Sequence, residues 1–209
     1  MAHLKQDRAV KTRQTIISAA AEVFDEFGYN GASMRQIMQR AGVTLGAVYF
    51  HFPNKEELAR TVMNSQPGTV VPRLTSQGLQ RVVDMTLVWS CQLQRDPILR
   101  AGVRLGVEQV GFGLRETASY EAWEHLIEDC FVGAQEFGEL REHVVPRSLA
   151  EFVVGACTGV QLYSDLVCQR ADLPARIVEM WKVLLPGIAD DSTVQRIDAS
   201  VQRATDLVA

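Results

Sequence analysis

The chain has 209 residues, of which 47% are hydrophobic and 22% charged, and its net charge is −4. This length allows one or two domains with a sizeable core. No apolar stretch reaches the roughly 18 residues that a membrane span needs, and residues 1–14 lack the apolar core of a signal peptide. We therefore expect a globular protein of the cytoplasm without membrane contact.

The four cysteines are widely spaced and lie in apolar helical patterns. Cys91, Cys130, Cys157 and Cys168 form no close CxxC pair, which argues against a zinc site and against a disulfide framework. We expect buried free thiols and no cofactor.

Residues 12–27 predict the first helix. Its apolar positions recur at helical spacing, and Gly28 is expected to end it. The preceding residues form a polar, basic arm with Lys5, Arg8, Lys11 and Arg13. This arm either contacts phosphates or a minor groove of DNA, or it is a solvated tail.

The next segment has the pattern of a helix-turn-helix. Ser33 and Gln36 form a capping box that starts a helix, and Gly42 suits the left-handed turn that ends it. A second helix is expected to start at Thr44, as its N-cap, and to stop at Pro53. In such a motif the second helix lies in the major groove of DNA and offers its first residues to base edges.

The side chains around the second helix suit contacts to phosphates and bases. The candidates for DNA binding are Ser33, Arg35, Thr44, Leu45, Gly46, Ala47, Tyr49, His51 and Lys55. An ordinary helical hairpin within a bundle is the alternative that periodicity alone leaves open.

Residues 11–63 resemble the DNA-binding domain of the tetracycline-repressor (TetR) family. The resemblance runs through TRQTIISAAAEVFDEFGYNGASMRQIMQRAGVTLGAVYFHFPNKEELA, including the Phe-Gly-Tyr turn, the Ala-Gly-Val turn and the aromatic-His-Phe exit. It implies a sequence-specific repressor that binds double-stranded DNA as a homodimer. Leu45 departs from many relatives, which place a basic residue there, and this puts the operator sequence in doubt.

A fourth helix is expected from Lys55 to about Gln66, and Pro67-Gly68 breaks it. In TetR-like proteins this helix connects the DNA-reading domain to the body. Residues 1–66 carry eight Lys or Arg and six Asp or Glu, whereas residues 67–209 carry thirteen and nineteen. The positive charge is therefore concentrated where DNA would bind.

The remainder shows no sustained strand pattern, so the predicted fold class is all-α. We expect a helix-turn-helix domain over residues 1–66 and a helical-bundle domain for ligand binding and dimerisation over residues 67–209. The expected helices of the body are 79–94, 97–109, 120–139, 149–170, 175–186 and 192–207.

Two half-sites on palindromic DNA require a two-fold dimer. The expected seam is built by 149–170, with Phe152, Val153, Gly155, Ala156, Gly159, Val160, Leu162 and Tyr163, and by 175–186, with Ile177, Met180, Trp181, Leu184 and Leu185. Packing within one chain is the alternative for these faces.

Three further segments are similar to the γ-butyrolactone autoregulator receptors, a TetR branch of antibiotic-producing actinomycetes. They are Tyr120-Glu-Ala-Trp123-Glu, the stretch from Pro97 to Leu105, and Glu-Met-Trp around Trp181. The resemblance implies a tryptophan, here Trp123, in a pocket for a small hydrophobic lactone, butenolide or furan-type hormone. In those receptors, binding of this ligand releases the operator, so the resemblance implies that this chain controls secondary-metabolite genes.

Carried onto this chain, the resemblance gives two polar anchors, Gln66 and Thr158, beside Trp123. The apolar lining would come from Val82, Met85, Leu87, Leu99, Val103, Phe131, Gly155, Leu162 and Trp181. For each of these, plain core packing is the alternative.

Two other functions remain open at this point. One is a xenobiotic sensor that controls an efflux pump, supported by Glu108 and Glu128 as pocket charges, and the other is a DNA-bound regulator controlled by a protein partner. An enzyme is not expected, because the sequence has no GxSxG, HExxH, Walker A or dinucleotide fingerprint.

Overall fold

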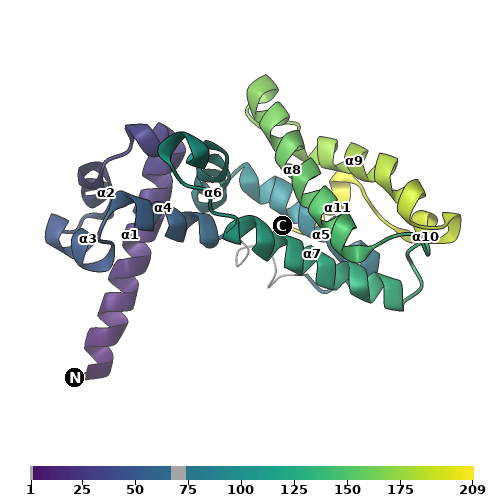
Figure 1. The fold of residues 1–209 in the computed structure, drawn as a ribbon, viewed down its shortest axis with the longest axis horizontal. Coiled ribbons are helices and arrows are strands. Elements are labelled where there is room, and N and C mark those ends of the chain that lie inside the picture. Colours follow the sequence, from purple (N-terminus) through teal and green to yellow (C-terminus); the bar gives the residue numbers. More distant parts are fainter. Residues whose placement is uncertain (1, 67–73) are drawn as a thin grey trace. The chain divides into compact units, whose positions relative to one another are not determined.

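The computed structural model describes residues 2–66 and 74–209, and this part of the chain contains helices without any strand (Figure 1). By packing, the chain divides into two compact units. The N-terminal unit consists of Met1–Gln66 together with Asp96–Ser119, and the C-terminal unit consists of Pro67–Arg95 together with Tyr120–Ala209. The all-α prediction is confirmed for the described residues.

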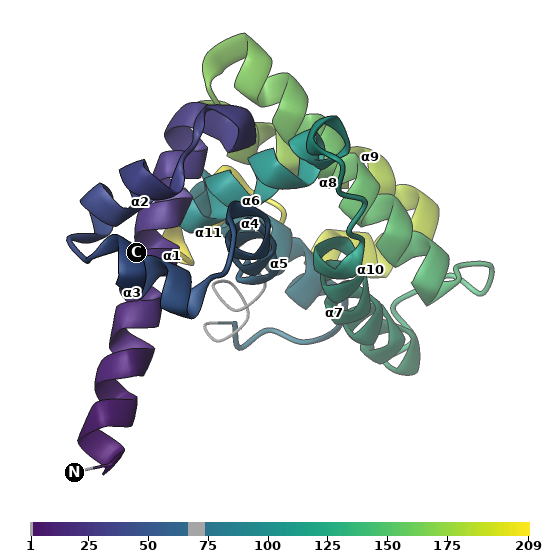
Figure 2. The ribbon, with the colours of Figure 1, turned by 60° about the vertical axis from the view of Figure 1, so that its left-hand side comes forward.

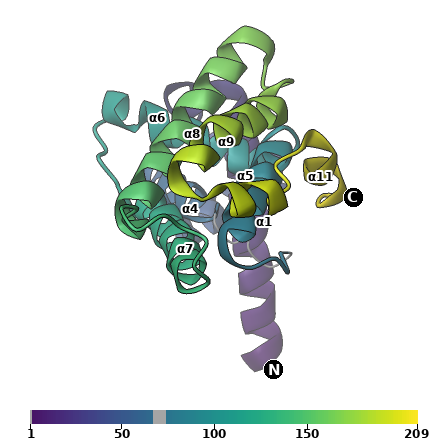
Figure 3. The same ribbon diagram turned by 90° about the vertical axis from the view of Figure 1, so that its right-hand side faces the viewer.

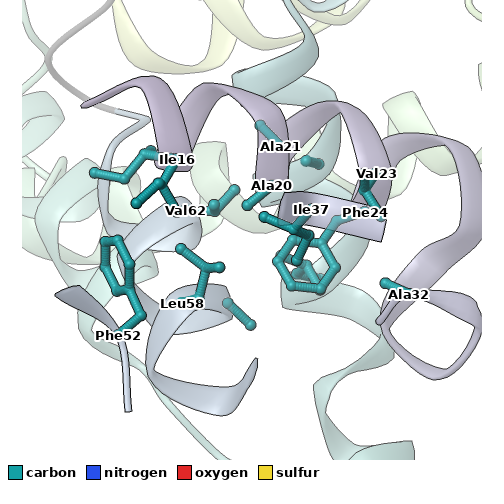
Figure 4. Close-up of a cluster of buried hydrophobic side chains, with 14 of the residues drawn as sticks. Ile16, Ala20, Ala21, Val23, Phe24, Ala32, Ile37, Phe52, Leu58 and Val62 are labelled. Atoms are coloured by element: carbon teal, nitrogen blue, oxygen red, sulfur yellow. The ribbon is translucent and has the colours of Figure 1, made fainter. Parts of the chain in front are cut away.

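The N-terminal unit contains five α-helices and a short 3-10 helix, η3, among its described residues. Their bounds are α1, Ala2–Gly31; α2, Met34–Ala41; α3, Leu45–His51; α4, Lys55–Asn64; α6, Pro97–Glu108; and η3, Gln109–Phe112. Helix α1 packs against α2, α4 and α6 (Figure 2). Its inward face forms the centre of the core with Ile16, Ala20 and Phe24, against Ile37 and Leu58 (Figure 4).

The start of α1 differs from the prediction. The expected polar arm is helical from Ala2, and the side chain of Lys5 lies outside the described residues. Arg8, Lys11 and Arg13 are exposed on the first turns, which project from the rest of the unit (Figure 2). A helix is about 10 Å wide with its side chains, so these turns are too broad to enter a minor groove of roughly 6 Å as an extended arm can.

The C-terminal unit is built around α5, whose residues 82–91 are all buried. Its helices are α5, Gly78–Leu93; α7, Ala118–Glu136; α8, Pro146–Cys168; α9, Leu173–Ile188; α10, Asp191–Arg196; and α11, Val201–Asp206. Helix α5 packs against α9 and α11, and α8 lies beside α9 (Figure 3).

The expected last helix, 192–207, is two short helices. Ile197 has an extended backbone, and Ser200 caps α11 by accepting from Arg203 N. The break allows Arg203 to reach the buried carboxylate of Asp84, with Nη2 and Oδ2 2.7 Å apart. Tertiary pairing therefore overrides a continuous amphipathic pattern.

The expected domain boundary at residue 66 follows the order of the sequence, whereas packing assigns residues 96–119 to the N-terminal unit as well. Helix α4 ends at Asn64, close to the predicted end, and the predicted break at Pro67-Gly68 lies outside the described residues. No described helix combines the length and apolar character that crossing a bilayer requires.

Candidate functional site

Local capping fixes the two helices of the helix-turn-helix as predicted. Ser33 Oγ accepts from Gln36 N at 3.3 Å and donates to the side-chain oxygen of the same residue at 2.6 Å. Gly42 takes the left-handed conformation at φ 64°, and Thr44 Oγ1 accepts from Ala47 N at 3.2 Å. These bonds satisfy amides that a helix leaves unpaired at its start.

Helix α3 presents one face to the core and one to solvent. Val48 and Phe52 are buried, one turn apart, and join the core of the unit. The predicted contact residues Thr44, Leu45, Gly46 and Tyr49 are exposed, while Ala47 and His51 are half-buried. Arg35 and Ser33 on the preceding helix are also exposed.

Phe50 is an exposed residue of α3 that the list of DNA-binding candidates lacked. Its side chain is 82% exposed and packs edge-on against His51, with ring centroids 5.1 Å apart. An apolar ring at this position can contact a thymine methyl group. The helical period could have revealed it, because Phe50 lies off the stripe that Val48 and Phe52 form.

Lys55, a predicted DNA contact, bonds to main-chain groups of its own unit. Its ammonium donates to the carbonyls of Tyr29 at 2.8 Å and Ala32 at 3.0 Å, and it lies 4.2 Å from the centre of the Tyr29 ring. Burial lowers the pKa of Lys55. The side chain therefore fastens the end of α1 to the start of α4.

Arg13 connects the first turns of α1 to the end of the recognition helix. Its guanidinium lies 5.0 Å from the centre of the Phe52 ring. This cation–π contact places an exposed positive charge next to the segment that would face DNA.

A hollow of about 330 Å³ lies further along α1. It is lined by Lys11, Gln14, Thr15, Ser18, Ala19, Glu22, Arg40 and Ala41, so its walls are too polar for an apolar ligand.

The predicted ligand-binding residues are divided between the two units. Gln66, Leu99 and Val103 belong to the N-terminal unit, and the others belong to the C-terminal unit. Gln66 is buried, its amide donates to Met63 O at 3.0 Å, and it approaches Gly102 so closely that a Cβ there would lie 2.5 Å from Gln66 Nε2.

Within the C-terminal unit, Val82, Met85, Leu87 and Phe131 are buried. Trp123 on α7 is half-buried, and Thr158 Oγ1 on α8 donates to Val154 O at 2.8 Å. These side chains come from α5, α7 and α8, three of the six helices from which the sequence predicts the pocket.

Trp181, predicted to line the pocket, is a core residue of the C-terminal unit. Its side chain is fully buried, and its indole N–H donates to Thr86 Oγ1 on α5 at 2.7 Å. The neighbouring stripe on α9 also points inward, because Ile177 and Leu185 are buried. The predicted contribution of these three α9 residues to a dimer seam is therefore wrong, since they pack within one chain.

Helix α8 has a second apolar face that the described chain leaves uncovered. Leu162 and Gly155, predicted to line the pocket, lie on this exposed face. We define the outer face of α8 as its exposed residues Phe152, Gly155, Gly159, Leu162, Tyr163, Leu166 and Val167. The buried residues Val153, Cys157 and Gln161 lie on the opposite side.

Gln161 is a polar group that sequence reasoning missed. Its side chain is fully buried, and its oxygen accepts from Arg170 Nε at 3.2 Å. Because arginine only donates, this bond fixes which end of the amide is oxygen. The amide nitrogen has no hydrogen-bond partner among the described residues. Gln161 is one turn from Thr158 on α8.

The two acidic residues offered as pocket charges are both engaged elsewhere. Glu108 pairs with Arg104 at 2.7 Å, and Glu128 pairs with Arg147 at 3.3 Å.

All four cysteines are free, but only Cys91 and Cys157 are buried, so the expectation of buried thiols is wrong for Cys130 and Cys168. Burial raises the pKa of the Cys157 thiol to about 12.

Two family models match this chain. The model for bacterial regulatory proteins of the tetR family matches residues 16–62, and a tetracyclin repressor-like C-terminal domain matches residues 76–190. The A-factor receptor protein of Streptomyces griseus is 37% identical over 193 residues, which cover 92% of this chain and 69% of that protein.

Solved structures agree with these matches. TylP, a TetR regulator from Streptomyces fradiae, is 37% identical and superposes with a TM-score of 0.88 over 96% of this chain and 97% of its own. A gamma-butyrolactone receptor, described as ArpA-like, is 29% identical and has a TM-score of 0.71 over 96% of this chain and 98% of its own.

Proposed function

Because the chain belongs to the tetR family of bacterial regulatory proteins, we propose that it is a transcriptional repressor released from a palindromic operator by a small hydrophobic signalling molecule. The observation that carries the proposal is α3, a helix anchored by Val48 and Phe52 whose exposed side offers Leu45, Tyr49 and Phe50. Such a helix can enter the major groove with its first residues toward the bases.

A γ-butyrolactone or a related butenolide or furan is the ligand class that we propose. The similarity to the A-factor receptor and to a gamma-butyrolactone receptor supports this class. Trp123 would supply a flat apolar wall, and the unpaired amide of Gln161 would supply a donor for a ligand oxygen. The target genes would be those of secondary metabolism. The protein would act in the cytoplasm of the producing cell.

We propose that the repressor acts as a homodimer through the outer face of α8. Leu166 is 85% exposed, and Phe152 and Tyr163 lie on the same face. Gly155 and Gly159, also on this face, would allow a second helix to approach closely. An exposed apolar stripe of this length is typical of an interface.

The efflux-pump alternative loses the charges that supported it, because Glu108 and Glu128 are paired with arginines.

The decisive experiment is a gel-shift titration of the purified protein on the DNA upstream of its own gene. The protein–DNA complex is then titrated with γ-butyrolactones, butenolides and furans. Release by one of these classes would support the proposal and name the class. A stable shift without release would instead favour a regulator controlled by a protein partner.

Replacing Trp123 with alanine is expected to leave operator binding intact and to abolish release. The reason is that Trp123 lies in the C-terminal unit, outside the helix-turn-helix, while its ring would provide a large part of the ligand contact. Gel shifts with and without ligand measure both effects. Loss of DNA binding in this variant would mark Trp123 as part of the structural core.

Replacing Gln161 with leucine is expected to weaken ligand binding about tenfold, the value of one hydrogen bond of roughly 1.4 kcal/mol. The same change removes a buried donor without a partner, which offsets the loss of the bond that Gln161 Oε1 accepts from Arg170 Nε, so the melting temperature should change little. Calorimetric titration and thermal unfolding measure these two quantities. Unchanged ligand affinity would show that the amide has no ligand partner.

A further inference from the structure

The end of α1 is completed by side chains of α6. In an unbroken helix, the N–H of Tyr29 would donate to the carbonyl of Asp25, four residues earlier. Gly28, at φ 67° and ψ −179°, is not helical and turns the Tyr29 amide away from that carbonyl. Glu108 Oε2 accepts from Tyr29 N at 3.1 Å instead. Arg104 Nη1 donates to the Asp25 carbonyl at 2.6 Å.

Arg104 and Glu108 therefore act together in place of one main-chain hydrogen bond. They are one turn apart on α6 and pair with each other, with Nε and Oε1 at 2.7 Å. A Cβ at Gly28 would lie 2.7 Å from Arg104 Nη2 and 2.9 Å from Glu108 Oε2. The positive φ favours glycine, and a Cβ here would also displace the two side-chain ends that bond to α1.

Aromatic stacking adds a second attachment at the same place. The rings of Tyr29 and Phe112, on η3, are stacked with centroids 3.7 Å apart. Tyr29 also contacts the ammonium of Lys55 at the start of α4. The end of α1 therefore joins η3 to the helix that follows the recognition helix.

The far end of the α6–η3 segment is fastened to α4. Arg60 Nε on α4 donates to a carboxylate oxygen of Glu116 at 2.9 Å. The side chain of Gln109 bonds to both the N–H and the carbonyl of Glu116, at 2.7 and 3.1 Å. Residues 97–116 are thus held to the DNA-reading helices at several points.

We propose that Arg104 and Glu108 transmit ligand binding to the helix-turn-helix. The inference rests on the function proposed above. In chain order, α6 follows α5 directly and leads through η3 to α7. Helices α5 and α7 belong largely to the C-terminal unit, which we propose binds the ligand. A displacement of either junction must move α6, and the bonds of Arg104 and Glu108 to main-chain groups make α1 follow. Charge-assisted bonds of this kind are among the strong ones.

The test combines Arg104→Met with Glu108→Gln in the full-length protein. Operator affinity is measured with and without a saturating 2-acyl-γ-butyrolactone, whose own affinity is followed by calorimetry. In the wild type the ligand should weaken operator binding by about 5- to 150-fold, the usual range of allosteric coupling. In the double variant this ratio should fall to below about 2-fold, while ligand affinity stays unchanged.

A merely stabilising pair would leave this ratio unchanged even if the melting temperature fell, and that result would overturn the proposal. The matched control is Arg40→Met, which removes exposed ion pairs between α2 and α1 in the same unit. An equal loss of coupling in this control would also overturn it. Arg104→Lys keeps the positive charge but loses the guanidinium, which can donate to two acceptors at once. This single variant is tested instead if the double variant does not fold.

Hydrogen–deuterium exchange provides a readout without ligand. Operator binding should slow amide exchange in α6 of the wild type and leave α6 of the double variant unaffected. Unaltered exchange in wild-type α6 on operator binding would overturn the proposal. If no lactone releases the wild type, the proposed function fails, and this exchange experiment still decides the role of Arg104 and Glu108.

Discussion

A Leu166→Glu variant is expected to be monomeric and to bind its operator at least about 100-fold more weakly than the wild type. Leu166 is the most exposed apolar residue on the outer face of α8, which we propose as the dimer interface. A two-fold interface would contain the substitution twice, so two carboxylates would lose water without a partner. One helix-turn-helix would then have to bind alone.

Analytical ultracentrifugation and a gel shift at the same protein concentration measure the two effects. The control is Val132→Glu, which adds the same charge to an exposed valine of α7, a helix that contributes no residue to the outer face of α8 as defined above. This control should remain dimeric with wild-type operator affinity. A Leu166→Glu protein that stays dimeric would show that the dimer uses another surface.

An Arg203→Met variant is expected to be destabilised by about 3–5 kcal/mol, the usual result of leaving one member of a buried ion pair alone. Asp84 is 1% exposed, and Arg203 Nη2 donates to it at 2.7 Å. Gln80 Nε2 would remain as a donor at 2.8 Å, which does not neutralise the charge. Urea denaturation followed by circular dichroism measures the change.

The matched control for this prediction is the double variant Asp84→Leu with Arg203→Met. It replaces both charges by apolar groups and should recover most of the lost stability, because no unpaired carboxylate remains. A double variant as unstable as Arg203→Met would show that α11 is held mainly by packing. Unchanged stability in Arg203→Met itself would contradict a buried ion pair at this position.

The features that the sequence predicts correctly are local. The caps at Ser33 and Thr44 each use a side chain that bonds to an amide three residues later, so the residues next to the cap are enough to predict it. Gly42 is similar, because a left-handed turn residue is recognised from its own identity and position. These features place the helix-turn-helix without knowledge of tertiary contacts.

The contacts that the sequence does not reveal depend on distant partners. Lys55 binds carbonyls of Tyr29 and Ala32, more than 20 residues earlier in the chain. The indole of Trp181 donates to Thr86, 95 residues away. A basic or aromatic residue beside a predicted site can serve the site or the core, and periodicity does not distinguish these roles. The buried amide of Gln161 has no sequence signature at all.

The assignment of residues 96–119 to the N-terminal unit has a consequence for engineered regulators. A chimera that joins residues 1–66 to the body of a relative would inherit a foreign α6 against its own α1. Gly28 would then meet side chains other than Arg104 and Glu108, and the Asp25 carbonyl and Tyr29 N–H would lack their partners. The portable DNA-reading module of this chain is therefore discontinuous, and a graft should carry both segments.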